Sequence, residues 1–471
     1  MKSRAWTPQQ ARAWLEGIHY RGMQLGMERV ENLAARLGNP EQTFPSVLIA
    51  GTNGKGTVAA LLDHILSAAG LRVGRYTSPH MVDWTERIAI GGVPIEEEDF
   101  ARALQAVSTE ADRLEATPFE TLTMAAFWHF RRVDLDWGVI EVGLGGRLDA
   151  TRLCRAQVTV ITTIGVDHTG ELGSDLEGIA REKGSIMRDR VPAVLCPGTD
   201  QVRGILESQA AEQGSRVIPA RELVDLSGGP DQPWGMSGSA LWKGGAAQVA
   251  LTQGEPERFE WTLPLAGEHM LNNLTTALAV VASMRDMGVS IPTDAIIEGV
   301  GSVRWPGRLQ YITAPQGCPD LVLDVGHNPL AARVISREIQ ARTGGRLKRL
   351  VLALAAEKDL HGFIEPLIGW ADTVIATRWD GSRARDPQEI ALAVDKLAER
   401  LDLQVRVKTA PDPISEVEEA TRGMDREGLV VVTGSHMLVG PILDVLDDGQ
   451  GQERLWPEMT LSAPWNLRRR L

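Results

Sequence analysis

The sequence contains few cysteines and no long apolar stretch, and both absences limit what kind of protein it is. Its only three cysteines, Cys154, Cys196 and Cys318, lie far apart and show no paired spacing. This argues against a disulfide framework and a structural zinc site, and it fits a reducing cytoplasm. No run of about 18 apolar residues occurs, and the first residues lack the apolar core of a signal peptide. We therefore expect a cytoplasmic protein with neither a membrane span nor a signal peptide.

The sequence has fewer basic than acidic residues, and no repeat of short period is visible in it. Lys and Arg number 49 against 62 Asp and Glu, which gives a formal net charge of -13. This balance argues against unspecific binding to nucleic acid, although it leaves room for a local basic cleft. The chain has 471 residues, of which 43% are hydrophobic and 24% charged. We therefore expect a soluble globular protein with two or three domains.

The most informative stretch is a glycine-rich loop between an apolar run and a helical pattern. The run Val47–Ala50 leads into Gly51-Thr52-Asn53-Gly54-Lys55-Gly56-Thr57, and helically spaced apolar residues follow as far as Gly70. This order predicts a strand, a phosphate-binding loop and a helix. In such a loop the backbone N–H groups face an anion, Lys55 reaches the outer phosphates and the Thr57 hydroxyl ligates Mg²⁺. Gly56 departs from the usual spacing, and the alternative interpretation is a tight turn.

Polar residues follow two other predicted strands. Leu71–Tyr76 is followed by Thr77-Ser78-Pro79-His80, and Val158–Thr163 is followed by Asp167 and His168. Ligands of α/β sheets gather at the carboxyl ends of the strands. We therefore expect some of these side chains near the phosphates, although each alone is more often a plain loop residue.

A carboxylate, Glu141, lies inside the apolar strand predicted at Trp137–Gly143. Burying it is costly unless it is paired or binds a metal. The two interpretations are a Mg²⁺ ligand, as in the second nucleotide-binding strand of phosphate-loop proteins, and an ion pair with a nearby Lys or Arg. Lys183 lies in a helix predicted at Leu176–Gly184, where a lysine is ordinarily solvated.

The remaining patterns organise the chain into two parts. Thr7-Pro8 predicts a helix start, Gly22–Gly26 a flexible connection, and Thr117–Glu120 the start of an apolar helix. A small β region is predicted near 220–265, with strands at Gln248–Leu251 and Arg258–Leu263, and a helix opens after Gly267. Val303–Arg308 is the candidate linker. Beyond it, alternating strands and helices predict a second α/β unit, with strands near Leu321–Val325, Leu350–Leu354, Thr373–Ala376, Val405–Val407 and Leu429–Thr433. The expected domains are 1–303 and 304–448, followed by an irregular tail at 449–471.

Together these motifs resemble the Mur ligase superfamily and, within it, the folylpolyglutamate synthase / dihydrofolate synthase family. The resemblance extends from about residue 10 to about residue 445. Its most specific part is Glu141-Val142-Gly143-Leu144-Gly145-Gly146-Arg147-Leu148-Asp149-Ala150-Thr151, a block typical of the folate branch. The other anchors are the phosphate loop, Thr77–His80, Glu86–Ile88, Asp167–Thr169, Arg181–Lys183, Pro306–Arg308 and His327–Pro329.

This resemblance implies an α/β fold, with a phosphate-loop N-terminal domain around a parallel-type central sheet and a Rossmann-like C-terminal domain. It implies an ATP-dependent amide ligase that joins L-glutamate to dihydropteroate, or to the γ-carboxylate of a folate, through an acyl phosphate. ATP and two Mg²⁺ ions are the implied cofactors, and the implied protein is a monomer with no nucleic-acid or membrane partner. The alternatives are another Mur-type amino-acid ligase and a nucleotide-binding switch protein that does not ligate.

The resemblance also assigns residues to roles. The expected catalytic residues are Lys55, Glu141, His168 and Lys183. The expected ATP contacts are Asn53, Gly54, Lys55, Gly56, Thr57, Asn273, Arg308, Asp324 and His327. The expected Mg²⁺ ligands are Thr57, Ser78, Glu141, His168 and Lys183, the last after carbamylation. The expected pterin or folate contacts are Gln24, Leu25, Gly26, Thr117, Phe119, Glu120, Leu148, Asp149 and Ala150. The sequence departs from the family pattern at Arg152, where Asn is usual, at Met270, where Gln is usual, at Val325-Gly326 and at Gly184-Ser185.

Overall fold

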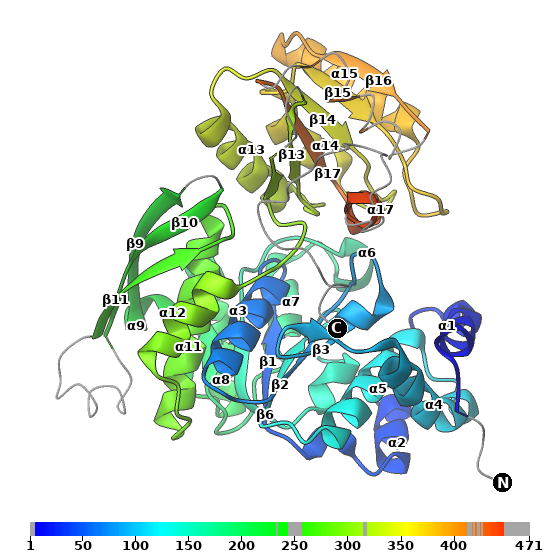
Figure 1. The fold of residues 1–471 in the computed structure, drawn as a ribbon, viewed down its shortest axis with the longest axis vertical. Helices are drawn as coiled ribbons and strands as arrows, with labels where there is room; N and C mark the ends of the chain where they lie inside the picture. Colours follow the sequence, from blue (N-terminus) through cyan, green and yellow to red (C-terminus); the bar gives the residue numbers. More distant parts are fainter. Residues whose placement is uncertain are drawn as a thin grey trace. The chain divides into compact units, whose positions relative to one another are not determined.

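The computed structural model describes residues 5–231, 234–243, 257–313, 318–411, 417, 420–421, 424 and 427–446. The chain divides into two compact units (Figure 1). Unit 1 consists of Met1–Gly228, Gly238–Thr262 and Leu271–Val303, and unit 2 of Gly229–Ser237, Leu263–Met270 and Arg304–Leu471. The strand predicted at Gln248–Leu251 and the tail predicted at 449–471 lie outside the described residues.

A parallel sheet forms the centre of unit 1. Its strands are β1 (Ser46–Ala50), β2 (Val73–Tyr76), β3 (Ile88–Ile90), β4 (Val93–Pro94), β5 (Trp137–Glu141), β6 (Ala156–Ile161), β7 (Ala193–Leu195) and β8 (Val217–Pro219). Their order is β4-β3-β2-β5-β1-β6-β7-β8. Only β3 and β4 run antiparallel to their neighbours. Every residue of β1 and β5 is buried, as expected for parallel strands that are covered on both faces. The predicted parallel-type central sheet is confirmed.

Helices surround this sheet (Figure 1). They are α1 (Pro8–Gly17), α2 (Glu28–Arg36), α3 (Lys55–Ala68), α4 (Glu97–Arg113), α5 (Pro118–Arg132), α6 (Thr169–Leu172), α7 (Leu176–Gly184), α8 (Asp200–Gln213), α9 (Ala220–Leu223), α11 (His269–Asp286) and α12 (Thr293–Ser302), with short 3₁₀ turns η1 (His19–Arg21), η2 (Pro40–Gln42), η3 (Trp84–Arg87) and η4 (Ala150–Leu153). Thr7 and Thr117 cap α1 and α5, and each is followed by a proline in the first turn. Both predicted helix starts are therefore confirmed.

A three-stranded sheet occupies most of the predicted β region. It consists of β9 (Val224–Asp231), β10 (Gly235–Trp242) and β11 (Glu257–Leu263), in the order β11-β10-β9. The prediction found β11 but missed β9 and β10, because their glycines and serines favour loops. The structure explains why one of these residues, Gly238, is a glycine. A Cβ atom there would lie 2.0 Å from the backbone oxygen of Ser227, so the strands approach too closely for any side chain.

Unit 2 contains a second parallel sheet. Its strands are β12 (Gln310–Ile312), β13 (Asp320–Leu323), β14 (Lys348–Leu352), β15 (Thr373–Ala376), β16 (Arg406–Thr409) and β17 (Leu429–Thr433), in the order β12-β13-β17-β14-β15-β16. Only β12 is antiparallel, and it was not predicted. Its helices are α13 (Pro329–Thr343), α14 (Leu360–Ile368), α15 (Pro387–Leu401) and α17 (His436–Leu446). The expected α/β fold of the C-terminal part is confirmed.

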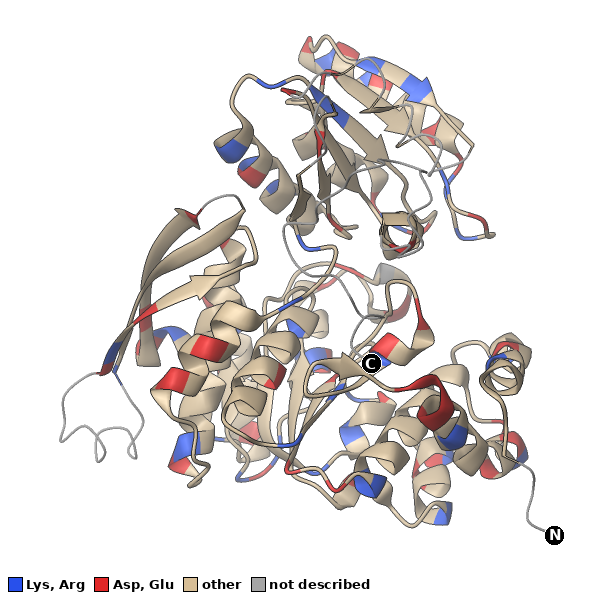
Figure 2. Cartoon of the chain, viewed as in Figure 1, with Lys and Arg blue, Asp and Glu red and all other residues tan. Residues whose placement is uncertain are grey.

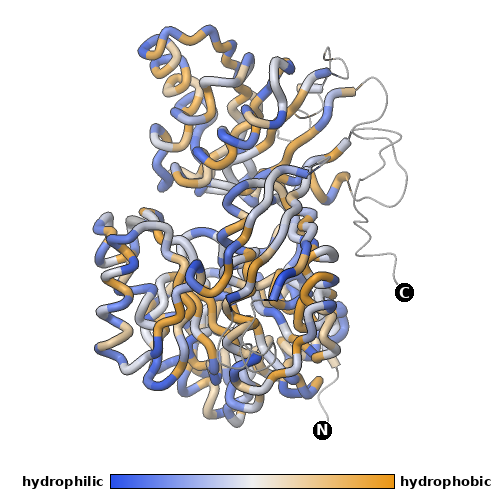
Figure 3. Tube along the Cα trace, turned by 90° about the vertical axis from the view of Figure 1, so that its left-hand side faces the viewer, coloured by the Kyte–Doolittle hydropathy of each residue, from blue (hydrophilic) through white to orange (hydrophobic). Residues whose placement is uncertain are grey.

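Charge and hydropathy follow this architecture. Lys, Arg, Asp and Glu gather on helices and loops (Figure 2), and apolar segments lie inside each unit (Figure 3). Each unit has its own cluster of buried apolar side chains. Within the described residues, no helix combines the length and the apolar character that a bilayer crossing needs.

Candidate active site

The phosphate loop is fixed to the end of β6 by hydrogen bonds. Thr52 N donates to the backbone oxygen of Thr163 at 2.8 Å, and the Thr162 hydroxyl donates to the backbone oxygen of Asn53 at 2.8 Å. Gly51 has φ +152°, and a Cβ atom there would lie 1.8 Å from Thr162 Oγ1. The loop therefore has one conformation that only glycine permits at this position.

Asn273 lies against this loop, as its predicted role in ATP binding requires. It comes from the first turns of α11 and is buried. Gly54 has φ +91°, and a Cβ atom there would lie only 2.4 Å from Asn273 Oδ1. The fold thus brings Asn273 into contact with a loop that is remote from it in sequence.

The N-terminus of α3 lies at the loop and has no side-chain cap. The helix begins at Lys55, and its N-cap residue is Gly54, which offers no side chain to its first N–H groups. Such N–H groups, with the positive end of the helix dipole, suit an anion. Thr57 lies in the first turn and is buried. Lys55 Nζ donates to the backbone oxygen of Thr52 at 3.4 Å.

Glu141 and Ser78 meet at the carboxyl ends of β5 and β2. Ser78 N donates to Glu141 Oε2 at 3.1 Å, and Lys55 Nζ lies 3.9 Å from Glu141 Oε1. The ion pair that the sequence left open is therefore present, but it is longer than a hydrogen bond. Among the described residues, no group of three or more His, Cys, Asp or Glu side chains is placed to hold a metal ion. A metal here would need hydroxyl and phosphate oxygens besides Glu141.

Lys183 is buried, whereas a lysine in a surface helix is ordinarily exposed to solvent. Only 5% of the residue is exposed. Helix α7 packs against the glycine-rich loop after β5: a Cβ atom at Gly146 would lie 2.7 Å from the backbone oxygen of Glu182. Burial, together with the positive charge of Lys55, lowers the pKa of Lys183 to about 7, while Asp167 and Asp149 act in the opposite direction. Lys183 therefore lies close enough to Lys55, Asp167 and Asp149 for their charges to act on its amine.

His168 has a different environment from the one its predicted roles suggest. It is exposed, has φ +52° and lies just before α6. Its backbone N–H donates to Asp167 Oδ1 at 2.8 Å. Asp167 is the more buried of the two residues, and its charge acts on Lys183, although the resemblance assigned a site role only to His168.

Two groups of predicted substrate residues come together next to Glu141. Thr117, Phe119 and Glu120 begin α5, and a Cβ atom at Gly143 would lie 2.5 Å from the Phe119 ring and 3.2 Å from Asp149 Oδ2. Asp149 accepts a hydrogen bond from Leu144 N at 2.9 Å and another from Thr151 N at 3.0 Å, and burial raises its pKa. Leu148 is half-buried and Ala150 is buried beside it.

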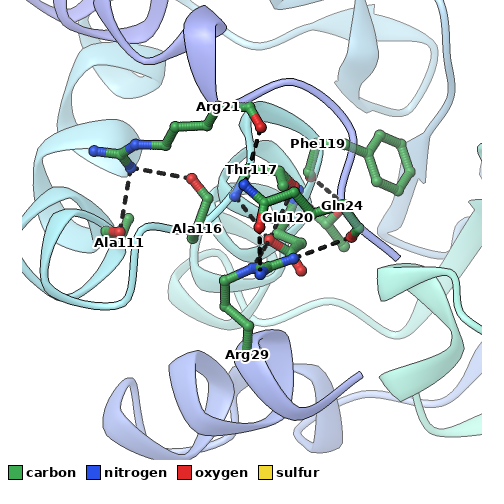
Figure 4. A network of polar contacts seen from close by, with 9 residues as sticks. Arg21, Gln24, Arg29, Ala111, Ala116, Thr117, Phe119 and Glu120 are labelled. Carbon is green, nitrogen blue, oxygen red and sulfur yellow. Dashed lines mark hydrogen bonds and ion pairs between the residues drawn. The ribbon is translucent and has the colours of Figure 1, made fainter. Parts of the chain in front are cut away.

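Gln24 joins this region through an arginine that the sequence did not reveal. Arg29 contacts both Gln24 and Glu120 (Figure 4). Arg29 lies in the first turn of α2, where a positive charge is unfavourable because it opposes the helix dipole. This unfavourable position is the sequence signal that Arg29 is needed for a contact elsewhere. The neighbouring residues Leu25 and Gly26 complete the predicted loop.

The predicted residues of unit 2 gather at the carboxyl end of β13. Asp324 Oδ2 accepts from Leu309 N at 2.9 Å, and its Oδ1 accepts from Gly326 N at 2.6 Å. Burial raises the pKa of Asp324, and the charge of Arg308 opposes this effect. His327 Nδ1 lies 3.0 Å from the backbone oxygen of Val325. Arg308, Asp324 and His327 therefore form one polar group within unit 2.

Comparisons with known proteins match both parts of the chain. Residues 49–281 match the Mur ligase middle domain, and residues 307–436 match the glutamate ligase domain of Mur ligases. The dihydrofolate synthase/folylpolyglutamate synthase of Escherichia coli K12 is 32% identical, with 92% of this chain and 94% of that protein covered.

Solved structures agree with these matches. E. coli FolC in complex with DHPP and ADP has a TM-score of 0.80 at 29% identity, with 94% of this chain and 98% of that chain covered. A bifunctional folylpolyglutamate synthase/dihydrofolate synthase with Mn, AMPPNP and L-glutamate bound has a TM-score of 0.77 at 30% identity, with 94% and 100% covered.

Proposed function

The chain belongs to the folylpolyglutamate synthase/dihydrofolate synthase family of Mur ligases, and from this premise we propose how it works as an ATP-dependent glutamate ligase. The substrates are L-glutamate and a carboxylate of dihydropteroate or of a folate. The observation that carries the proposal is the meeting of the phosphate loop, Glu141 and Lys183 at one edge of the unit 1 sheet. A carboxylate and the γ-phosphate of ATP can react there.

The chemistry explains why ATP is needed. A carboxylate is a poor acyl donor, because its oxygen would have to leave as oxide. Attack of a carboxylate oxygen on the γ-phosphorus breaks the bond to ADP and gives an acyl phosphate. The glutamate amine then attacks the acyl carbon, loses a proton and expels phosphate, which leaves an amide. Because negative charge gathers in both steps, the protein contributes mainly positioning and electrostatics.

The residues around the phosphate loop have the properties that ATP binding needs. The N–H groups from Asn53 to Thr57 and the uncapped start of α3 suit the phosphates, and Lys55 adds a positive charge. Asn273 would contact the nucleotide from α11. Arg308, Asp324 and His327 are the corresponding proposed contacts in unit 2. We assign residues 1–303 and 304–448 to the two ligase domains on the same basis.

The oxygen atoms of Thr57, Ser78 and Glu141 fit Mg²⁺, which prefers oxygen ligands. The Glu141 carboxylate is buried, and its Oε2 accepts a hydrogen bond from Ser78 N at 3.1 Å. When bound, Mg²⁺ would neutralise phosphate charge. His168 stays a proposed member of this site, and its exposed position makes it the least supported one.

Carbamylation of Lys183 is supported by its burial and its lowered pKa. Only a neutral amine attacks CO₂, and at a pKa of about 7 a large share of Lys183 is neutral at physiological pH. The ammonium group first loses a proton, and the neutral amine then forms a C–N bond to CO₂ and releases a second proton, so a buried cation becomes a carbamate anion. This anion would hold the second Mg²⁺ of the proposed site.

A coupled phosphate-release assay tests the proposed function. We expect Mg²⁺-dependent phosphate release only when ATP, L-glutamate and either dihydropteroate or tetrahydrofolate are all present. Running the two acceptors side by side shows whether the enzyme has one activity or both. Release that depends on a cell-wall precursor instead of either acceptor would identify another Mur-type ligase. Release without any acceptor would indicate a nucleotide hydrolase.

A further inference from the structure

The loop between η1 and α2 exposes apolar side chains next to the proposed substrate residues. Gly22 and Gly26 bound it, with φ +60° and +143°. Met23 is 60% exposed and Leu25 is 63% exposed. Apolar side chains that protrude from a short loop next to a binding region suggest a surface that a ligand covers.

Arg29 connects this loop to the start of α5 with three nitrogen atoms. Its Nε donates to Glu120 Oε2 at 2.8 Å, its Nη1 donates to Gln24 Oε1 at 3.0 Å and its Nη2 donates to the backbone oxygen of Gln24 at 3.0 Å (Figure 4). A planar guanidinium fixes the directions of its donors. The loop is therefore held in one orientation relative to Glu120.

Glu120 is a rigid anchor for this contact. It is buried, and its Oε2 also accepts from Thr117 N at 2.7 Å and from the Thr117 hydroxyl at 2.9 Å. Phe119, its neighbour, packs on the loop that carries Asp149. The position of Gln24 is thus fixed, through Arg29, relative to the start of the helix that supplies the proposed substrate contacts.

The Gln24 side chain is exposed, and both ends of its amide form hydrogen bonds within the protein. Its Oε1 accepts from Arg29, and its Nε2 donates to the backbone oxygen of Arg21 at 3.1 Å. Arg21 in turn donates to the backbone oxygens of Ala111 at 3.3 Å and Ala116 at 3.0 Å. The loop is therefore held at both ends through hydrogen bonds of Gln24 to Arg21 and Arg29.

We propose that Arg29 is a positioning residue for the folate-type acceptor, acting through Gln24, and that Met23 and Leu25 form the loop's substrate-facing surface. This rests on the proposed function. Gln24 then acts on the substrate through the loop, whereas the resemblance assigned it a direct substrate contact. The ligand chemistry that suits this surface is a flat ring system with apolar faces.

Arg29→Lys separates this role from a plain ion pair. Lysine keeps the positive charge beside Glu120 but cannot reach both Gln24 oxygens at the same time. We expect KM for dihydropteroate or tetrahydrofolate to rise about tenfold, while kcat and KM for ATP change by less than about twofold. Arg36→Lys is the matched control, because Arg36 lies on the same helix and pairs with Glu110 at 3.2 Å on the surface. It should leave all three constants unchanged.

Hydrogen exchange provides a second measurement that does not depend on activity. In Arg29→Lys the amides of residues 22–26 should exchange faster, and those of the α5 start should not. Gln24→Leu should raise KM by a similar factor, and the double variant should be no worse than either single variant, because both remove the same contact. Wild-type KM and wild-type exchange in Arg29→Lys would overturn the proposal, as would effects that multiply. If the wild-type enzyme uses neither acceptor, the proposed function fails, and exchange alone decides whether Arg29 holds the loop.

Discussion

Lys183 should cost the protein stability, and the size of this cost can be worked out. Burial and the charge of Lys55 lower its pKa from 10.5 to about 7. In the unfolded chain the same amine keeps its ordinary pKa. Between these two values the unfolded state binds more protons than the folded state, so the free energy of unfolding rises with pH. Below about pH 7 the lysine is charged in both states and the full cost applies.

The pKa difference corresponds to a cost on the order of 5 kcal/mol, since one pKa unit is about 1.4 kcal/mol. Lys183→Met removes the charge but does not pack ideally in its place. We therefore expect the metal-free variant to be about 2–4 kcal/mol more stable than wild type at pH 6, with a difference that shrinks towards pH 10. The same variant should lose ligase activity.

Urea unfolding at pH 6 and pH 9.5, in EDTA and without bicarbonate, measures this difference. Lys396→Met is the control, because Lys396 is exposed on α15 and should show no such pH dependence. A Lys183→Met protein that is less stable than wild type at pH 6, or equally changed at both pH values, would refute the reasoning. Added bicarbonate should stabilise wild type but not the variant, if carbamylation removes the buried cation.

Three further predictions concern the phosphate loop and its surroundings. Glu141→Gln keeps an oxygen that can accept from Ser78 N, so we expect the Tm to change by less than about 3 °C. We expect turnover to fall about 100-fold or more. Normal turnover in the phosphate-release assay would remove Glu141 from the mechanism. Gly54→Ala forces a Cβ atom to 2.4 Å from Asn273 Oδ1 at φ +91°. We expect ATP affinity, measured by calorimetric titration, to fall at least about tenfold, and stability, measured by urea unfolding, to fall by about 1–3 kcal/mol. Unchanged affinity would mean that the loop is less rigid than described. Arg75→Met leaves Asp63 buried without the guanidinium that contacts it at 2.9 Å. We expect the free energy of unfolding, measured in urea, to fall by about 3–5 kcal/mol, and most of this loss to be recovered in the double variant Asp63→Leu/Arg75→Met. A double variant as unstable as the single one would contradict this explanation.

Much of the fold could be predicted because strong local signals coincide with it. The apolar strands, the capped helix starts at Thr7 and Thr117 and the glycine after Lys183 each mark an element that the structure contains. β9, β10 and β12 were missed for physical reasons. The first two are rich in small residues that pack against a neighbouring backbone, and β12 has only three residues.

The candidate site was predictable where a residue conflicts with its surroundings. Glu141 is a charge inside an apolar strand, and this conflict predicted a buried carboxylate with a partner. Arg75 gives the same signal inside β2, where it contacts Asp63. Lys183 gives no such signal, because its burial is produced by packing of α7 against a loop that precedes it in the chain. The contact of Asn273 with Gly54 is likewise a tertiary property that no local pattern contains.

The outer strands of the two large sheets have a consequence for the behaviour of the protein at high concentration. An open edge of a parallel sheet offers unpaired N–H and C=O groups to another chain and so invites aggregation. Here β4 has two residues and contains Pro94, and β8 ends at Pro219, which has no N–H to donate. At the far edge of the unit 2 sheet, β16 carries Arg406 and Lys408 on exposed positions. β4, β8 and β16 are thus too short, too poor in donors or too charged to recruit a neighbouring molecule, which should limit aggregation through these three edges when the enzyme is abundant.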